Sequence, residues 1–177
     1  MVNHLLYVLS ARLRCRLIYP DGRLYLERYY LGQLLGVTFY LHRFVGTDGD
    51  RHVHNHPWSH SLAVVLSGGY DETVATDISP RSHHASGCAV RKRRVRWLNW
   101  IPGHRFHKID RTQPGTWTLF CHGARRRVGS HREYKGWGFL ERVDAVTVVY
   151  RQYTGADSGV AWWLTAPVGR DAGRAPL

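Results

Sequence analysis

The sequence predicts a small all-β domain, either an antiparallel barrel or a two-sheet sandwich, and three observations carry this prediction. Turn residues recur at short intervals, as in Pro20-Asp21-Gly22, Ser67-Gly68-Gly69 and Pro114-Gly115. Between the turns lie strand-length runs rich in Val, Leu, Tyr, Trp and Phe, while helical periodicity is scarce. Short strands at regular spacing are typical of sandwiches and barrels.

Helical turns are expected only in the first 15 residues and near Gln33-Leu34-Leu35. After Leu164 the residues Gly, Ala, Arg, Asp and Pro dominate, so a flexible tail is expected over residues 165–177. One β-barrel domain is therefore expected over residues 1–164. The strongest strand signals lie at Leu24–Leu31, Val37–Phe44, Leu62–Leu66, Arg94–Trp100, Thr116–His122 and Ala145–Tyr153.

The composition excludes several classes of protein. The chain has 177 residues and 44% hydrophobic residues, enough for one core, and no apolar run approaches the ~20 residues that span a bilayer. The N-terminal run lacks a small-residue cleavage pattern, which disfavours secretion. Three scattered cysteines, Cys15, Cys88 and Cys121, suit neither a disulfide framework nor a CxxC zinc module. We therefore expect a cytoplasmic protein with reduced, unbridged cysteines.

The net charge of +12 leaves a nucleic-acid partner open. Much of this charge lies in two short runs, Arg91–Arg96 and Arg125–Arg127, both next to turn-like sequence. No helix-turn-helix, zinc-finger or RNA-binding signature is present, so solvated loops or strand edges are the favoured interpretation. A small-molecule partner is expected instead, and a homodimer stays open.

The spacing of the histidines points to a metal. His52, His54 and His56 alternate, so an extended backbone would place all three rings on one face, as strands do when they offer imidazoles to an ion. His104 and His107 follow about 50 residues later. His83 and His84 lie in the polar segment SPRSHHASG and are expected to be solvated.

The strings HNHPW, LSGGYDE, FHKI, WTLF and WGF, in this order, resemble a group of small, largely uncharacterised cupin-like proteins of phages and bacteria. The resemblance implies the cupin double-stranded β-helix, a jelly-roll barrel with few short helices and a metal inside. Two alignments to the first cupin motif compete. Gly46 precedes His52 and His54 at the family spacing, whereas Gly68 closes the motif for His54 and His56.

The strings favour His54 and His56, and the second cupin motif adds His107, which follows Pro102 at the family spacing. The family's glutamate ligand is missing in both alignments, and Ser61 stands at its position in the favoured one. Three neutral imidazoles would then hold the ion, which suits Fe(II) first and also Zn(II), Mn(II) or Ni(II). Further ligand candidates are His52, His60, His122 and Glu72.

The candidate substrate-binding residues are Arg105, Arg125, Trp58 and Glu72. Arginine can bind a carboxylate or phosphate through paired hydrogen bonds, and an aromatic residue at a barrel mouth can contact substrate. The alternative interpretation is that the arginines lie at the surface and the tryptophan packs in the core, without contact to a substrate. The sequence leaves both interpretations open.

Three functions are consistent with these residues. The first is a metal-dependent Fe(II) oxygenase or oxidase acting on a small polar molecule. The second is a metal-independent sugar-nucleotide isomerase or epimerase with a histidine base, and the third is a non-catalytic cupin that binds a small ligand. The clustered histidines favour the first, because a base needs no second imidazole two residues away. No HxD…H pattern supports 2-oxoglutarate as cosubstrate.

Overall fold

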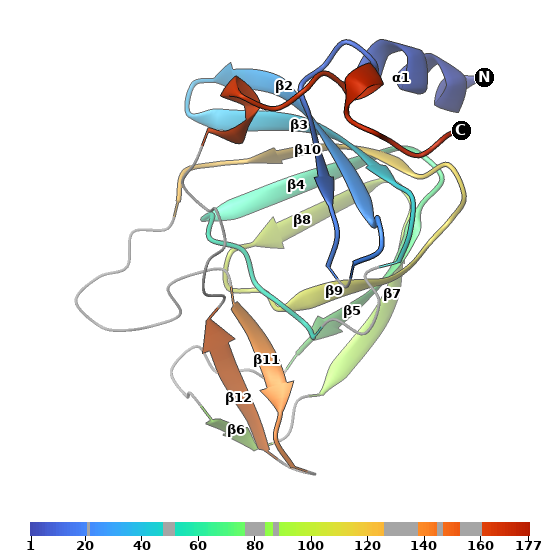
Figure 1. The fold of residues 1–177 in the computed structure, drawn as a ribbon. Helices are drawn as coiled ribbons and strands as arrows, with labels where there is room; N and C mark the ends of the chain where they lie inside the picture. Colours follow the sequence, from blue (N-terminus) through green and yellow to red (C-terminus); the bar gives the residue numbers. More distant parts are fainter. Residues whose placement is uncertain are drawn as a thin grey trace.

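The computed structural model describes residues 1–20, 22–47, 52–76, 84–86, 89–125, 138–144, 147–152 and 161–177. Strands dominate these residues (Figure 1). The helix α1 (Val2–Ser10) opens the chain, and two 3₁₀ turns, η1 (Trp162–Leu164) and η2 (Gly169–Asp171), lie near its end. The strands are β1 (Cys15–Ile18), β2 (Leu26–Leu34), β3 (Val37–Phe44), β4 (His60–Ser67), β5 (Tyr70–Ala75), β6 (His84–Ser86), β7 (Val90–Val95), β8 (Leu98–Pro102), β9 (His107–Thr112), β10 (Trp117–His122), β11 (Gly138–Arg142) and β12 (Thr147–Gln152).

The strands form one six-stranded antiparallel sheet, in the order β1-β2-β3-β10-β4-β8, and two three-stranded sheets, β7-β5-β9 and β11-β12-β6. Backbone bridges from His54 to His107 and to Phe139 connect β9 to β11 through the segment between β3 and β4. In Figure 1 the six-stranded sheet lies above β9, β5 and β7, and β11, β12 and β6 lie at the bottom. Two layers therefore face each other.

The strand order is that of a jelly roll. From β3 to β10 the chain passes back and forth between the two layers, except that β5 and β7 lie side by side in the same layer. The strands β3, β10, β4 and β8 are neighbours in one layer, and the His54 segment, β9, β5 and β7 are neighbours in the other. Two interleaved Greek keys of this kind define the eight-stranded jelly roll to which cupins belong. The all-β jelly-roll prediction is confirmed.

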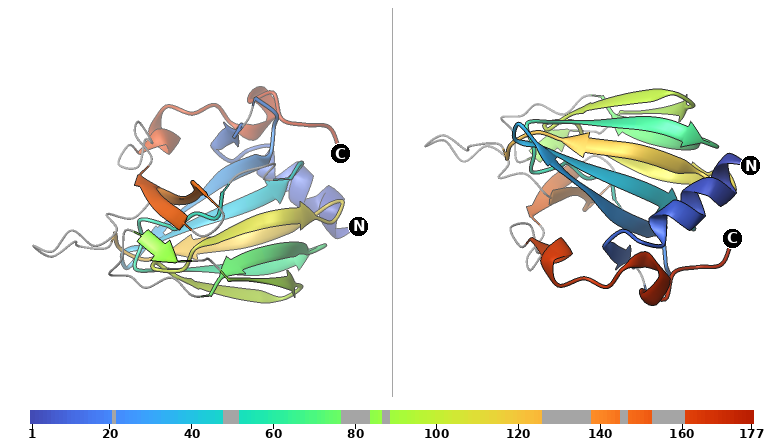
Figure 2. Two further views of the ribbon diagram at one scale, coloured as in Figure 1. Left: turned by 90° about the horizontal axis from the view of Figure 1, so that it is seen from below. Right: turned by 90° about the horizontal axis from the view of Figure 1, so that it is seen from above.

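Over the first half of β2, both faces of the six-stranded sheet are covered. On β2, Leu26 and Arg28 line a cavity between the layers, while Glu27 and Tyr29 are fully buried on the other face. Figure 2 shows the strands of this sheet side by side, with both chain termini at one end of the molecule. On the outer face, Cys15, Tyr29, Leu41 and Trp117 form a core cluster against which Leu6, Tyr7 and Leu13 pack.

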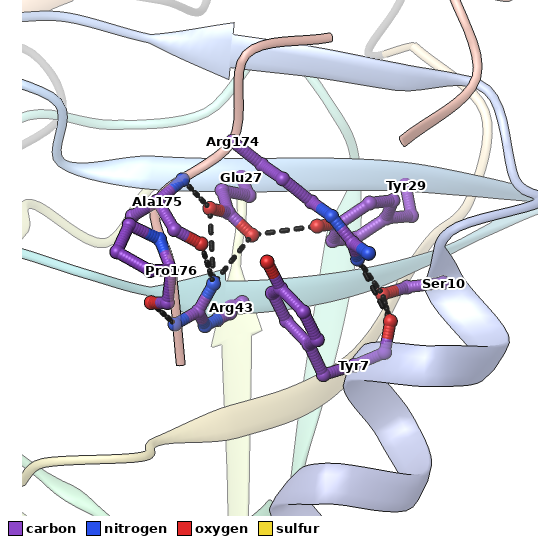
Figure 3. Close-up of polar contacts among 8 residues, drawn as sticks. All are labelled: Tyr7, Ser10, Glu27, Tyr29, Arg43, Arg174, Ala175 and Pro176. Carbon is purple, nitrogen blue, oxygen red and sulfur yellow. Dashed lines mark hydrogen bonds and ion pairs between the residues drawn. The ribbon is translucent and has the colours of Figure 1, made fainter. Parts of the chain in front are cut away.

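Residues 165–177, for which the sequence predicts a flexible tail, lie on this outer face (Figure 3). Arg43 donates hydrogen bonds to the carbonyl oxygens of Ala175 (2.7 Å) and Pro176 (2.5 Å). The backbone N–H of Ala175 donates to Glu27 Oε1 at 2.8 Å, and Arg43 Nη1 lies 3.2 Å from the same oxygen. The segment thus supplies hydrogen-bond partners to the buried ion pair between Arg43 and Glu27. Its composition gives no sign of this role.

Arg174 connects the same segment to the helix. Its Nη1 atom donates to the carbonyl oxygen of Tyr7 (2.7 Å) and to Ser10 Oγ (3.1 Å), and its guanidinium lies 3.7 Å from the centre of the Tyr7 ring. The N-terminal helix, predicted within the first 15 residues, is present as α1, Val2–Ser10. Both ends of the chain are therefore packed on one face of the sheet.

Two predicted elements are wrong. Arg94–Trp100 is not one strand, because the chain bends at Arg96-Trp97 and divides it between β7 and β8. The helical turn expected at Gln33-Leu34-Leu35 is the end of β2 and its hairpin turn, with Leu35 at a φ of 49°. The predicted strand Val37–Phe44 is confirmed as β3. Residues 145, 146 and 153 of the last predicted strand lie outside the described residues.

Two further predictions concern single features. Within the described ranges, no helix combines the length and apolarity that crossing a membrane requires. Cys15 and Cys121 are free thiols, while Cys88 lies outside the described residues.

Candidate metal centre

Three histidines from two segments converge in the cavity. The ligand atoms of His54, His56 and His107 all lie within 4.8 Å of one another, and the Nε2 atoms of His56 and His107 are 2.8 Å apart. We call these residues the three-histidine cluster. Reciprocal backbone hydrogen bonds between His54 and His107, of 2.8 and 2.9 Å, set the two segments side by side. Asn55 lies between the two histidines, and its Oδ1 accepts a hydrogen bond from the N–H of Gly138 at 2.8 Å.

The structure places His56, and not His52, in the cluster. His52 is exposed, and its ring stacks on Phe139 with centroids 5.2 Å apart. His52 lies outside the cluster, and its stacking partner Phe139 is the bridge partner of His54, in keeping with the shared face that the alternation predicts.

Glu72 orients His107. Its Oε1 atom lies 2.5 Å from His107 Nδ1, and the carboxylate is fully buried. Asn99 and Arg93 donate further hydrogen bonds to it, at 2.9 and 2.7 Å. Burial alone would raise the pKa of Glu72, but the contacts with His107, Asn99 and Arg93 lower it to about 2. An ionised Glu72 holds the imidazole proton on Nδ1 and leaves Nε2 of His107 free to bind a metal.

His56 is neutral in this setting. Burial lowers its pKa well below the ordinary 6.5, and the neighbouring rings of His107 and His54 add to this shift. Metal ligation requires the neutral imidazole, so the cavity favours the binding form of the side chain.

The other ligand candidates lie outside the cluster. His60 is exposed, stacks on Trp100 at 5.0 Å and contacts Ser59 through Nδ1. His122 lines the cavity, but its ring stacks on Trp58 with centroids 3.9 Å apart. Burial lowers the pKa of His122 to about 4. Both residues are therefore aromatic packing partners here.

The cavity between the layers has a volume of about 490 Å³. Its walls are aromatic and basic, and no carboxylate of the described residues lines it. A small molecule of negative charge would meet no like charge there. The nitrogen-bearing charged or titratable residues that line it are Arg16, Arg28, Arg125, His42, His54, His56, His107 and His122.

The four candidate substrate-binding residues separate into two pairs. Trp58 and Arg125 line the cavity and form a backbone bridge with each other. Arg105 does not line it and donates to the carbonyl oxygen of Trp100. Glu72 is also absent from the cavity wall, because it lies behind His107 and bonds that ring. His83, Arg126 and Arg127 lie outside the described residues.

Sequence reasoning missed two residues of the cavity wall, Arg28 and His42. They are cross-strand partners on β2 and β3, and Arg28 Nε donates to His42 Nε2 at 3.1 Å. A signal was present: His42 alternates with Tyr40 and Phe44, which places it on the face of two aromatic residues that also line the cavity.

A scan of family models and a search of curated proteins found no match to this chain. Similar solved structures include KdgF from Halomonas sp., with 15% identity over 63% of this chain and 88% of that one, at a TM-score of 0.42. Streptomyces albus HEPD, with 2-hydroxyethylphosphonate and Fe(II) bound, matches with 11% identity over 64% of this chain and 25% of its own, at 0.45. A cupin-2 domain protein from Rhodospirillum rubrum matches with 14% identity over 65% and 72%, at 0.38.

Proposed function

We propose that this protein is a metal-dependent jelly-roll enzyme, a non-haem Fe(II) oxygenase or oxidase that acts on a small polar molecule. His54, His56 and His107 would hold the ion. The observation that carries the proposal is the convergence of three imidazoles within 4.8 Å in a cavity, with a buried carboxylate orienting one of them.

The donor set fits a divalent transition metal. Imidazole nitrogens suit Fe(II), Zn(II) and Ni(II). An imidazole nitrogen bound to zinc lies about 2.0–2.1 Å from the ion. The 2.8 Å separation of the two Nε2 atoms is within the span of two ligands on one such ion. Three protein ligands leave positions open for a substrate. Because the cluster contains no carboxylate, the bound ion would keep its full double positive charge.

In this proposal the ion and the residues around it have separate roles. A bound Fe(II) ion would supply the redox chemistry with dioxygen. Glu72 keeps the proton of His107 on Nδ1, and the aromatic wall, which includes Trp58 and Phe120, limits the access of water. The cavity volume of about 490 Å³ fits a small organic substrate.

A second candidate function rests on the same contact. A histidine oriented by a buried carboxylate is also the arrangement of a general base, as a metal-independent isomerase or epimerase would need. The two candidates differ in one respect, since only the first requires His54 and His56 beside His107.

Elemental analysis tests the proposal on protein purified without a metal-affinity step and then incubated with Fe(II) under anaerobic conditions. The wild type and the His52→Ala variant are expected to retain one ion per chain, and the His56→Ala variant to lose it. Loss in His52→Ala with retention in His56→Ala would assign the other alignment. A wild type that binds no metal would overturn the proposal and leave the isomerase candidate.

A further inference from the structure

Three polar residues lie in one row across the six-stranded sheet. Arg28 on β2 pairs with His42 on β3, and His42 pairs with Thr118 on β10. Cross-strand partners point to the same face, and all three line the cavity that holds the three-histidine cluster. We call them the polar row. His107, on β9, belongs to the facing layer, so the cavity is bounded by the cluster on one side and the polar row on the other.

Arg28 has no acidic partner among the described residues. Its Nε atom donates to His42 Nε2, and its guanidinium lies 5.4 Å from the centre of the Tyr40 ring. Burial lowers the pKa of Arg28 to about 10, so the group stays charged at neutral pH. Arg28 is half-buried, and a partly buried charge without a carboxylate partner has a cost that an anion entering the cavity would reduce.

Three other arginines differ from Arg28 in having an acidic partner. Each has a carboxylate within ion-pair distance: Arg43 has Glu27, Arg93 has Glu72 and Arg94 has Asp71. Arg43 is buried and Arg93, like Arg28, is half-buried, so two enclosed arginines have a carboxylate partner, whereas Arg94 lies at the surface.

His42 holds Arg28 in place. Because its Nε2 accepts a hydrogen bond from Arg28, the ring is neutral with its proton on Nδ1. Burial and the nearby Arg28 charge lower its pKa well below 6.5, and its ring stacks on Phe120 at 4.9 Å. This contact occupies Nε of Arg28 and leaves the two Nη groups for a ligand.

Thr118 supplies a second, independent sign of a ligand. Its side chain is 1% exposed, and its Oγ1 atom has no hydrogen-bond partner among the described residues. Buried hydroxyl groups are nearly always hydrogen-bonded. A bound molecule that accepts from Arg28 could also accept from this hydroxyl, since both lie on the same row.

We propose that the substrate is an organic anion, and that Arg28, positioned by His42 and assisted by Thr118, binds its carboxylate or phosphate group across the cavity from the metal. This inference rests on the proposed function for the metal side of the cavity. The planar guanidinium fork matches both anions, whereas lysine offers only a point charge.

Isothermal titration calorimetry with methyl phosphate and with glycolate tests this, on metal-free and on Ni(II)-loaded protein. Arg28→Met is expected to weaken binding of the preferred probe by about 10- to 100-fold, as for a lost hydrogen bond to a charged group. Arg28→Lys should recover part of the loss, which guards against misfolding as the cause. Arg105→Met removes the same charge outside the cavity and is expected to bind as the wild type does. The probe bound more tightly identifies the phosphate or the carboxylate as the preferred group.

Metal affinity is measured on the same variants and should not change. Unaltered probe binding in Arg28→Met, equal loss in Arg105→Met, or binding of neither probe by metal-loaded wild type would each overturn the inference while leaving the proposed function standing. If the wild type binds no metal but binds a probe through Arg28, the proposed function fails and the anion site stands.

Discussion

The Nδ1 atom of His107 lies 2.5 Å from Oε1 of Glu72, and this contact joins the three-histidine cluster to a buried polar network. Ser61, the residue that the resemblance to cupins aligns with the family's glutamate ligand, is buried on β4 and lies outside the cluster. Glu72, on the next strand β5, contacts the ring of His107 and contributes no ligand atom to the cluster. The buried carboxylate therefore acts on one histidine of the cluster and is not a member of it.

Replacing Glu72 with Gln should lower metal affinity by about 10- to 100-fold, as the loss of such outer partners does in other metal sites. Glutamine keeps the volume but loses the charge that holds the proton on Nδ1 of His107. Competition with a chromophoric chelator measures the affinity. Asp71→Asn is the control, because Asp71 is the neighbouring residue and pairs with Arg94 at the surface. Equal affinities for Glu72→Gln and the wild type would contradict the assigned role.

The unfolding free energy of the metal-free protein should fall as the pH drops from about 6.5 toward about 4. Burial lowers the pKa of His122 to about 4, so between these values the unfolded chain binds a proton at this ring that the folded protein does not. Above and below this window the protonation of His122 adds no further pH dependence.

Urea unfolding at a series of pH values measures this dependence. His122→Gln should reduce the slope within the window, whereas His60→Gln, which alters an exposed ring, should keep it. Identical slopes in His122→Gln and the wild type would show that His122 is protonated with equal ease in both states.

Deleting residues 175–177 should destabilise the protein by at least about 2 kcal/mol. Arg43 would lose two carbonyl acceptors and Glu27 one backbone donor, while their charges stay buried. Chemical denaturation measures the loss. Deletion of Leu177 alone, a residue 60% exposed, should change the stability by less than about 0.5 kcal/mol. Equal stability of the two truncated proteins would mean that the end of the chain does not hold the ion pair.

Cys15 should resist alkylation in the folded protein. Its thiol is buried, and burial, followed by the charge of Glu27, raises its pKa to about 12, so the reactive thiolate is scarce at neutral pH. Iodoacetamide labelling with peptide mass mapping should modify Cys15 only after denaturation. Rapid labelling of Cys15 in native protein would indicate that α1 and β1 open readily.

The cupin-like strings favoured His54, His56 and His107, the residues that the structure brings together. Period-two spacing alone could not decide between His52 and His56, because both lie two residues from His54 and the alternation has no marked beginning. That beginning is set by pairing of His54 with β9 and β11, which lie more than 50 residues further along the chain. Long-range pairing of this kind leaves no local signal.

The position of Arg28 in the cavity wall could not be predicted from the sequence for a different reason. On a strand with one buried face, alternation tells which residues point inward. On β2 both faces are buried, since Leu26 and Arg28 face the cavity while Glu27 and Tyr29 lie beneath α1 and the C-terminal segment. The bend at Arg96-Trp97 was missed because it contains no Gly, Pro or Asn to mark a turn.

The position of β10 between β3 and β4 sets an order of events during synthesis. When the ribosome has made β3 and β4, each lacks a neighbour along one edge until Trp117–His122 emerges. His54 and His56 leave the ribosome about 50 residues before His107, so the nascent chain carries an incomplete three-histidine cluster for most of that interval. The six-stranded sheet therefore closes only after all three histidines have been made, and a premature stop before β10 removes the strand that joins β3 to β4.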